Sequence, residues 1–307
     1  MDWLSHLLAM MPVSGRLDLR CFYGAPWRID QEAGGAGGMA YHALLAGAAV
    51  VEDLGGGVPH RLGAGDILLV PSDSSHRLHD GGGVAAVPSR ERLGLNLVFS
   101  ENDGPGERLD MLCGHFVASE ANLRLFRAHL PPLLVVRGGQ SVVGAQVAGL
   151  LGLMRTEADH ESLGGRALLN ALSAALFALT LRLASEAVAA PVGLLAAAAH
   201  PGLAPALAAM LEAPGRAWTL PALAGVCHMS RATLARHFQR ALGRSAAALL
   251  LDIRMMAAGD ALRVPGRSVG DVAEAVGYQS EAAFQRVFKR EMGVTVGRWR
   301  RGVMVEK

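Results

Sequence analysis

The amino-acid sequence predicts an α+β protein of several domains: a strand-rich N-terminal part, a central helical region and an all-α C-terminal part. Three observations support this fold class. The chain has 307 residues, of which 51% are hydrophobic, enough to build more than one core. Short apolar segments fill the first 120 residues, whereas long stretches with helical periodicity follow. The formal net charge changes from −5 over residues 1–200 to +7 over residues 201–307.

Charge and cysteine content restrict the classes of function. A basic third is typical of a domain that contacts polyanions, although arginines that merely solvate a helical surface would give the same sum. Three cysteines are too few to staple a large secreted protein, and Asp2 stands where a signal peptide needs positive charge, so we expect a cytoplasmic protein. The longest apolar run, Ala171–Leu181, is shorter than the roughly 20 residues of a membrane span. We therefore expect no membrane partner.

Apolar, β-compatible segments separated by glycine-rich breaks predict an all-β N-terminal part. They are Gly38–Glu52, His60–Leu62, Asp66–Val70 and Met111–Val117.

The central region has the spacing of two long helices, Ser141–Thr156 and Arg166–Glu186. The second helix carries an apolar stripe that is wider than one small domain needs to cover, which predicts a dimer interface. The stripe consists of Leu168, Leu172, Leu176, Leu179 and Leu183. Pro191 and the alanines at 196–199 then predict a linker.

The strongest pattern in the basic third is a pair of helix-turn-helix motifs, at about 220–240 and 269–291. In the first, the helix Leu220–Cys227 is followed by a turn and a second helix capped by Ser230. The second motif repeats this order after the helix Val269–Val276. The two motifs match at an offset of fifty residues, as in the pairs Ser230/Ser280, Leu234/Phe284, Arg236/Arg286 and Phe238/Phe288.

Two motifs in register predict DNA binding, with a helical bundle that has no DNA role as the alternative. Candidate DNA contacts are the outward positions of the second helices, namely Arg231, Thr233, Arg236 and Arg240, then Gln279, Ser280, Glu281, Gln285, Arg286 and Lys289. The intervening helix, Ser245–Leu262, is long enough to hold the two readers about one turn of duplex apart.

Residues Leu203–Arg301 resemble the DNA-binding domain of the AraC/XylS family of bacterial transcription regulators. The run DVAEAVGYQSEAAFQRVFKREMGVTVGRWR carries the resemblance, with Val296 where the family usually has proline. The resemblance implies a sequence-specific regulator rather than an enzyme, in which Arg236 and Arg286 reach base edges. It also implies promoter half-sites in double-stranded DNA, RNA polymerase and a second copy of the chain as partners.

The segment GDILLVPSDSSH, which ends at His76, resembles the second motif of cupin barrels, and His42 lies where the first motif would be. The His-x-His pair and glutamate of metal-binding cupins are missing from that first motif. Two histidines are fewer than the three protein ligands of a catalytic zinc site. The resemblance therefore implies a cupin-like β-barrel used for sensing, and a cupin enzyme fused to a DNA-binding domain is the weaker alternative.

The whole chain, from MDWLSHLLAMMPVSG through RLDLRC and SSHRLH, is similar to the reactive-chlorine-responsive branch of the AraC/XylS family. This resemblance implies redox sensing by two N-terminal cysteines, which match Cys21 and Cys113. A disulfide would need their Cα atoms within about 7 Å. Arg20 and His115 are close enough in sequence to favour thiolates. A buried, inert cysteine is the alternative, and Cys227 is assigned to it.

If they converge, Cys21, His42, His76 and Cys113 also form a Cys2His2 set for zinc or another divalent metal, as a cofactor that the function does not require. The sequence thus predicts a cupin-like sensor over residues 1–123, a helical dimerisation or linker region over 124–195, and an AraC-type DNA-binding domain over 200–307. The predicted function is an oxidant-sensing transcription regulator. The alternative is a regulator that responds to a metal or a small ligand and has redox-inert cysteines.

Overall fold

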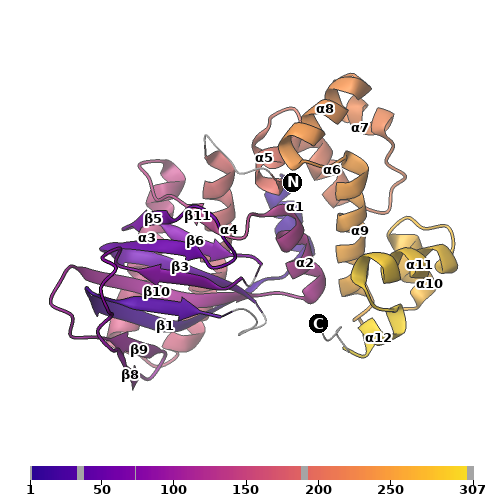
Figure 1. Ribbon diagram of the computed structural model, residues 1–307. Helices are drawn as coiled ribbons and strands as arrows, with labels where there is room; N and C mark the ends of the chain where they lie inside the picture. The colour runs from indigo at the N-terminus through magenta and orange to yellow at the C-terminus, as the bar shows by residue number, and fades with distance from the viewer. Residues whose placement is uncertain (1, 33–37, 73, 188–192, 303–307) are drawn as a thin grey trace. The chain divides into compact units, whose positions relative to one another are not determined.

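A computed structural model describes residues 2–32, 38–72, 74–187 and 193–302, and the chain divides into two compact units (Figure 1). The strand-rich unit comprises Val13–Ala118 and Leu130–Val188. The helical unit comprises Met1–Pro12, Ser119–His129 and Ala189–Lys307. This division differs from the expected boundaries near 123 and 195. Two segments from the first 130 residues belong to the helical unit, and the central helices belong to the strand-rich unit.

Two sheets form the strand-rich unit, with the strand orders β11-β6-β3-β10-β1-β9-β8 and β2-β7-β4-β5. The strands are β1 (Ser14–Gly24), β2 (Arg28–Gln31), β3 (Met39–Ala46), β4 (Ala48–Asp53), β5 (His60–Gly63), β6 (Ile67–Val70), β7 (His76–His79), β8 (Arg90–Leu93), β9 (Val98–Glu101), β10 (Arg108–Val117) and β11 (Leu134–Val136). Five of them confirm the four predicted segments, because Gly38–Glu52 contains both β3 and β4. The long central strands β1 and β10 pair antiparallel, with Ser14 opposite Val117 at one end.

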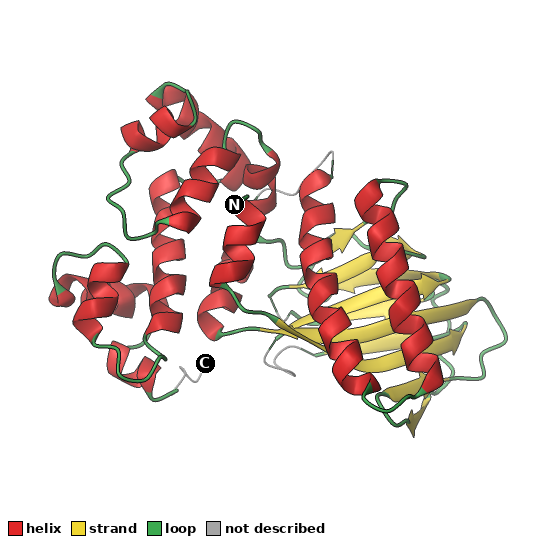
Figure 2. Ribbon diagram, turned by 180° about the vertical axis from the view of Figure 1, so that it is seen from behind, coloured by secondary structure: helices red, strands yellow, loops and turns green. Residues whose placement is uncertain are grey.

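Side chains from both sheets share one apolar core, which includes Leu44, Val51, Leu78, Met111 and both cysteines of this unit. Figure 2 shows α3 (Val142–His160) and α4 (Gly165–Glu186) lying across one face of the larger sheet. The nearly continuous burial along β10 thus has a cause, because one face meets the core between the sheets and the other meets helices.

The leucine stripe of α4 is not the free surface that the sequence predicted. Leu176 is fully buried and Leu183 is 8% exposed, because α4 packs against β1, β10 and α3 within its own unit. Only Leu168, 43% exposed, is an open position of the stripe. By length and composition α4 could span a membrane, yet this packing is that of a core helix.

The helical unit contains α5 (Leu194–Ala199), α6 (Ala204–Glu212), α7 (Leu220–Val226), α8 (Arg231–Leu242), α9 (Ala246–Ala261), α10 (Val269–Ala275), α11 (Glu281–Met292) and α12 (Val296–Arg300), together with α1 (Trp3–Met10) and α2 (Glu120–His129). Helix α9 runs between the α7–α8 pair and the α10–α11 pair (Figure 1). The linker predicted at 196–199 is wrong: these alanines form α5, because alanine has the highest helix propensity and its small side chain packs closely. Pro191 lies outside the described residues.

The two helix-turn-helix motifs are confirmed in detail. Ser230 and Ser280 cap α8 and α11 by accepting hydrogen bonds from the backbone N–H groups of Thr233 and Ala283. The first ten residues of the two helices have the same order of exposed and buried positions. The fifty-residue repeat of the sequence is therefore also a repeat in packing.

Candidate sensor and DNA-binding sites

The two cysteines predicted to sense oxidants lie together in the core of the strand-rich unit. Cys21 is on β1 and Cys113 on the adjacent strand β10, diagonal to each other, since Cys21 pairs with Met111 and Cys113 with Leu19. Their Sγ atoms are 3.9 Å apart, and both residues are buried and free. A disulfide has an S–S distance of about 2.05 Å, so the sulfurs need to approach by roughly 2 Å to bond.

Two histidines extend this pair into a chain of contacts between the sheets. His42 on β3 lies directly opposite Cys113, and its Nδ1 is 3.1 Å from Cys113 Sγ. Its Nε2 is 3.0 Å from Nε2 of His76, which comes from β7 in the other sheet. The structure therefore brings together all four side chains that the sequence selected.

The contact between His76 and the Ser74 carbonyl oxygen indicates which ring nitrogens of His76 and His42 carry protons. Nδ1 of His76 is 3.1 Å from the carbonyl oxygen of Ser74, which can only accept, so this nitrogen carries the proton. In neutral His76, Nε2 is then an acceptor, and Nε2–H of His42 donates to it. Nδ1 of His42 is left as an acceptor for the thiol proton of Cys113. Sequence reasoning missed this contact, because register across β10 and β3 is a tertiary property.

Burial keeps His42 and Cys113 uncharged near neutral pH. Desolvation lowers the pKa of His42 well below its ordinary value, and the neighbouring His76 adds to the effect. The side-chain contact with Cys21, together with burial, raises the pKa of the Cys113 thiol well above its ordinary value. The resting site thus holds a protonated Cys113 thiol beside a neutral imidazole.

The residues expected to favour thiolates do not contact the cysteines. Arg20 alternates to the opposite face of β1, where its guanidinium binds both carboxylate oxygens of Asp110 at 3.0 Å. Nδ1 of His115 is 2.7 Å from Asp18. The base beside Cys113 is His42 instead. Cys227 takes the structural role assigned to it, buried at the end of α7.

The zinc site stays a prediction. The four side chains contact one another in a row, from Cys21 through Cys113 and His42 to His76, rather than around one point. Both ring nitrogens of His42 already contact a neighbour in this row. Among the described residues, no group of three or more His, Cys, Asp or Glu side chains is arranged to hold a metal ion.

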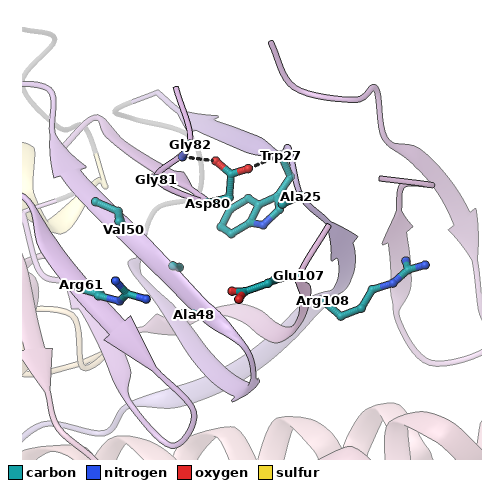
Figure 3. A pocket seen from close by; sticks show the side chains of 11 residues that line it. Ala25, Trp27, Ala48, Val50, Arg61, Asp80, Gly81, Gly82, Glu107 and Arg108 are labelled. Atoms are coloured by element: carbon teal, nitrogen blue, oxygen red, sulfur yellow. Dashed lines mark hydrogen bonds between the residues drawn. The ribbon is translucent and has the colours of Figure 1, made fainter. Parts of the chain in front are cut away.

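A separate cavity of about 400 Å³ opens in the same unit, and Figure 3 shows the side chains that line it. Trp27 is on one side, and Arg61, Glu107 and Arg108 bring charged groups to the rim. The carboxylate of Asp80 accepts hydrogen bonds from the backbone N–H groups of Trp27 and Gly82, which fixes this wall. The Trp27 ring also packs 5.8 Å from the ring of Tyr23, which belongs to the core around the cysteines.

In the helical unit, the candidate DNA contacts lie on the solvent side of α8 and α11. Exposed positions include Arg231, Arg236 and Arg240 on α8, and Gln279, Ser280, Glu281, Gln285, Arg286 and Lys289 on or just before α11. Thr233 is half-buried, and its hydroxyl is bound by that of Ser230 at 2.9 Å. Thr233 and Ser280 thus also serve helix capping. The opposite sides of the helices are buried through Leu234 and Phe238, and through Phe284 and Phe288.

Two helix-turn-helix motifs on either side of one helix, attached to a two-sheet unit with its own buried polar site, define a DNA-binding transcription regulator with a separate N-terminal domain. Residues 2–186 match the profile of a cupin family, and residues 223–302 match that of a helix-turn-helix domain. The chain belongs to the AraC-type helix-turn-helix regulators with an N-terminal cupin domain.

Two relatives match over nearly their full length. The chain is 31% identical over 304 residues to the RCS-specific HTH-type transcriptional activator RclR of Escherichia coli K12, with 99% of this chain and 98% of RclR covered. It is 27% identical to the HTH-type transcriptional regulator MtrA of Neisseria gonorrhoeae, with 98% of each covered. Among solved structures, the C-terminal domain of AraT from Geobacillus stearothermophilus is 28% identical, with 35% of this chain and 89% of that chain covered and a TM-score of 0.32.

Proposed function

We propose that this DNA-binding regulator senses a strong oxidant of the hypochlorous acid class through Cys21 and Cys113. The observation that carries the proposal is the 3.9 Å separation of the two Sγ atoms inside the cupin core, with His42 Nδ1 in contact with Cys113. The name of the Escherichia coli relative RclR, an RCS-specific activator, supports the same function.

The chemistry is a two-step oxidation that conserves atoms and electrons. The sulfur of Cys113 attacks the chlorine of hypochlorous acid while its proton passes to Nδ1 of His42. An S–Cl bond forms, the O–Cl bond breaks, and hydroxide leaves and takes up a proton as water. The sulfur of Cys21 then attacks Cys113 Sγ, chloride leaves, and the Cys21 thiol proton is released. The two sulfurs together lose two electrons, which reduce the oxidant to chloride.

Mass spectrometry after limited hypochlorite treatment tests this assignment. We expect a Cys21–Cys113 disulfide and an unmodified Cys227. Cys227 is a matched control, because it is 8% exposed, as is Cys113, but no hydrogen bond to a histidine side chain is found for it among the described residues. Cys21→Ser should abolish oxidant-dependent transcription and keep specific DNA binding. Equal modification of all three cysteines, or a fully responsive Cys21→Ser/Cys113→Ser variant, would contradict oxidant sensing.

A small-ligand sensor is the second candidate, and the cavity beside Trp27 favours it. Trp27→Ala would then abolish the response to an inducer while Cys21→Ser keeps it. A zinc-responsive regulator is a further alternative to oxidant sensing. Elemental analysis of the purified protein that finds one zinc per chain, lost in Cys113→Ser, would favour a metal-responsive regulator.

We also propose that the protein acts in the cytoplasm and recruits RNA polymerase, since relatives carry the names of transcriptional regulators and one is named an activator. A homodimer stays a prediction, because most of the leucines expected to form its interface are at least partly buried within the strand-rich unit. Sedimentation of the wild-type chain measures it directly.

A further inference from the structure

Helices α1 and α2 belong to the helical unit, yet each is joined to a central strand of the sensor sheet. Three residues, 11–13, separate α1 from β1, and two residues, 118 and 119, separate β10 from α2. The strand ends meet, because Ser14 pairs with Val117 and its hydroxyl donates to the carbonyl oxygen of Val117 at 3.5 Å. Both helices therefore leave the sensor from one point of the sheet.

Helix α2 is an integral part of the second half of the DNA-binding unit. Ala121 is 2% exposed and belongs to the same core cluster as Phe284 and Phe288 of α11. A Cβ atom on Gly259 of α9 would lie only 2.6 Å from the Cβ of Ala121, so glycine is needed for this close approach. At the other end of α2, His129 Nε2 is 2.8 Å from the carboxylate of Asp252 on α9.

Helix α1 contacts the first half instead. It packs against α6, which in turn packs against α7 of the first helix-turn-helix motif. Leu7 is fully buried and Leu4 is 7% exposed. One sensor strand is thus continuous with a helix on the first motif, and its neighbour is continuous with a helix on the second.

The proposed redox pair lies on the same two strands. Cys21 is on β1 and Cys113 on β10, and the β1–β10 register shifts between Leu17 and Leu19, between the cysteines and the strand ends. At this bulge Asp18 contacts His115 of β10 at 2.7 Å. A bulge locally disrupts the hydrogen-bond ladder between two strands, and closing the sulfur pair would act beside it, on the strand ends that continue into α1 and α2.

We propose that α1 and α2 are the transmitting elements of this regulator: a change in the pairing of β1 with β10 moves them, and they alter how the two reading helices are held on either side of α9. The oxidant form of the proposal rests on the proposed function, whereas the transmission itself does not. A ligand or modification that leaves β1 and β10 unchanged would shift nothing by this route.

Inserting Gly-Ser-Gly after both Pro12 and Ala118 gives an uncoupled full-length variant. The control carries one such insertion between Gly56 and Gly57, in the exposed turn that joins β4 to β5. In the wild type and the control, hypochlorite should change the Kd for the specific site by about fivefold or more, within the usual range of allosteric coupling. In the uncoupled variant the cysteines should oxidise equally by mass spectrometry, and the Kd should change by less than about twofold.

A second trigger needs no oxidant. The Cβ of Gly114→Ala would overlap the carbonyl oxygen of Arg16 across the strand pair, which forces β10 away from β1. This substitution should change specific DNA affinity in the wild-type background and leave it unchanged in the uncoupled one. Asp18→Asn, which weakens the His115 contact at nearly constant size, replaces it if Gly114→Ala does not fold.

Hypochlorite and the substitutions test two different hypotheses, oxidant sensing and transmission through α1 and α2. Cysteines that stay reduced in the wild type would refute the oxidant function, and the Gly114→Ala or Asp18→Asn comparison would still decide transmission. An uncoupled variant that responds like the wild type, or folded Gly114→Ala and Asp18→Asn chains with wild-type DNA affinity, would overturn the proposal.

Discussion

Removing the buried guanidinium of Arg20 should destabilise the strand-rich unit by about 3 kcal/mol. Arg20 is 1% exposed, and it joins β1 to β10 through two 3.0 Å contacts to Asp110. Burial opposes its charge, but the carboxylates of Asp110 and Asp159 together outweigh this effect and raise the pKa of Arg20 above its ordinary value. Breaking a buried pair typically costs about 3–5 kcal/mol, because the remaining charge is left uncompensated. The low end applies here, since Arg155 stays 3.6 Å from Asp110.

Hydrogen exchange of the β1 and β10 amides measures this loss. In Arg20→Ala, exchange through global opening of the unit should accelerate by about two orders of magnitude, which corresponds to about 3 kcal/mol. Arg90→Ala is the matched control, because Arg90 also pairs with an aspartate, Asp103, but both partners are exposed. Exposed pairs contribute little to stability, because water screens their charges. Equal acceleration in the two variants would refute the argument from burial.

Three further predictions follow from single side chains. Arg286→Ala should weaken specific-site binding by about 1–3 kcal/mol in a titration and leave binding to random duplex nearly unchanged. The pKa of His42 is lowered below 6.5, so its contribution to stability should be complete above pH 6.5 and be lost as pH decreases, by up to about 1.4 kcal/mol per pH unit. Urea titrations at several pH values measure this loss, and His42→Asn should reduce it. Leu176→Glu should unfold the strand-rich unit in a thermal melt rather than produce a monomer, whereas Leu168→Glu, at an exposed position, should melt like the wild type.

The DNA-binding half could be predicted from the sequence because its signals are local. Caps such as Ser230 and Ser280, and inward phenylalanines one turn apart, lie within a few residues of the elements that they define. The fifty-residue repeat then confirms each assignment by the other. The predicted helix boundaries at Leu220 and Val269 agree with the structure.

The sensor half depends on contacts that are distant in sequence. The sequence supplied Cys21, Cys113, His42 and His76, but not their order, because strand register decides that His42 rather than His115 meets Cys113. The sequence also did not indicate which structural unit each segment belongs to. Nothing in the local pattern of α2 indicates that Ala121 belongs to the core around Phe288.

Burial of the proposed redox pair sets how electrophilic an oxidant must be to react with it. The thiolate is the reactive form of cysteine, and the side-chain contact with Cys21, together with burial, raises the pKa of Cys113, so little thiolate is present near neutral pH. A weak oxidant then meets almost no reactive sulfur. An oxidant with a very electrophilic chlorine needs no preformed thiolate, because His42 Nδ1, 3.1 Å away, accepts the proton as the sulfur attacks. His76 keeps that acceptor directed at Cys113 by binding the opposite nitrogen. Under the proposed function, the same desolvation that makes the site inert at rest therefore makes it selective.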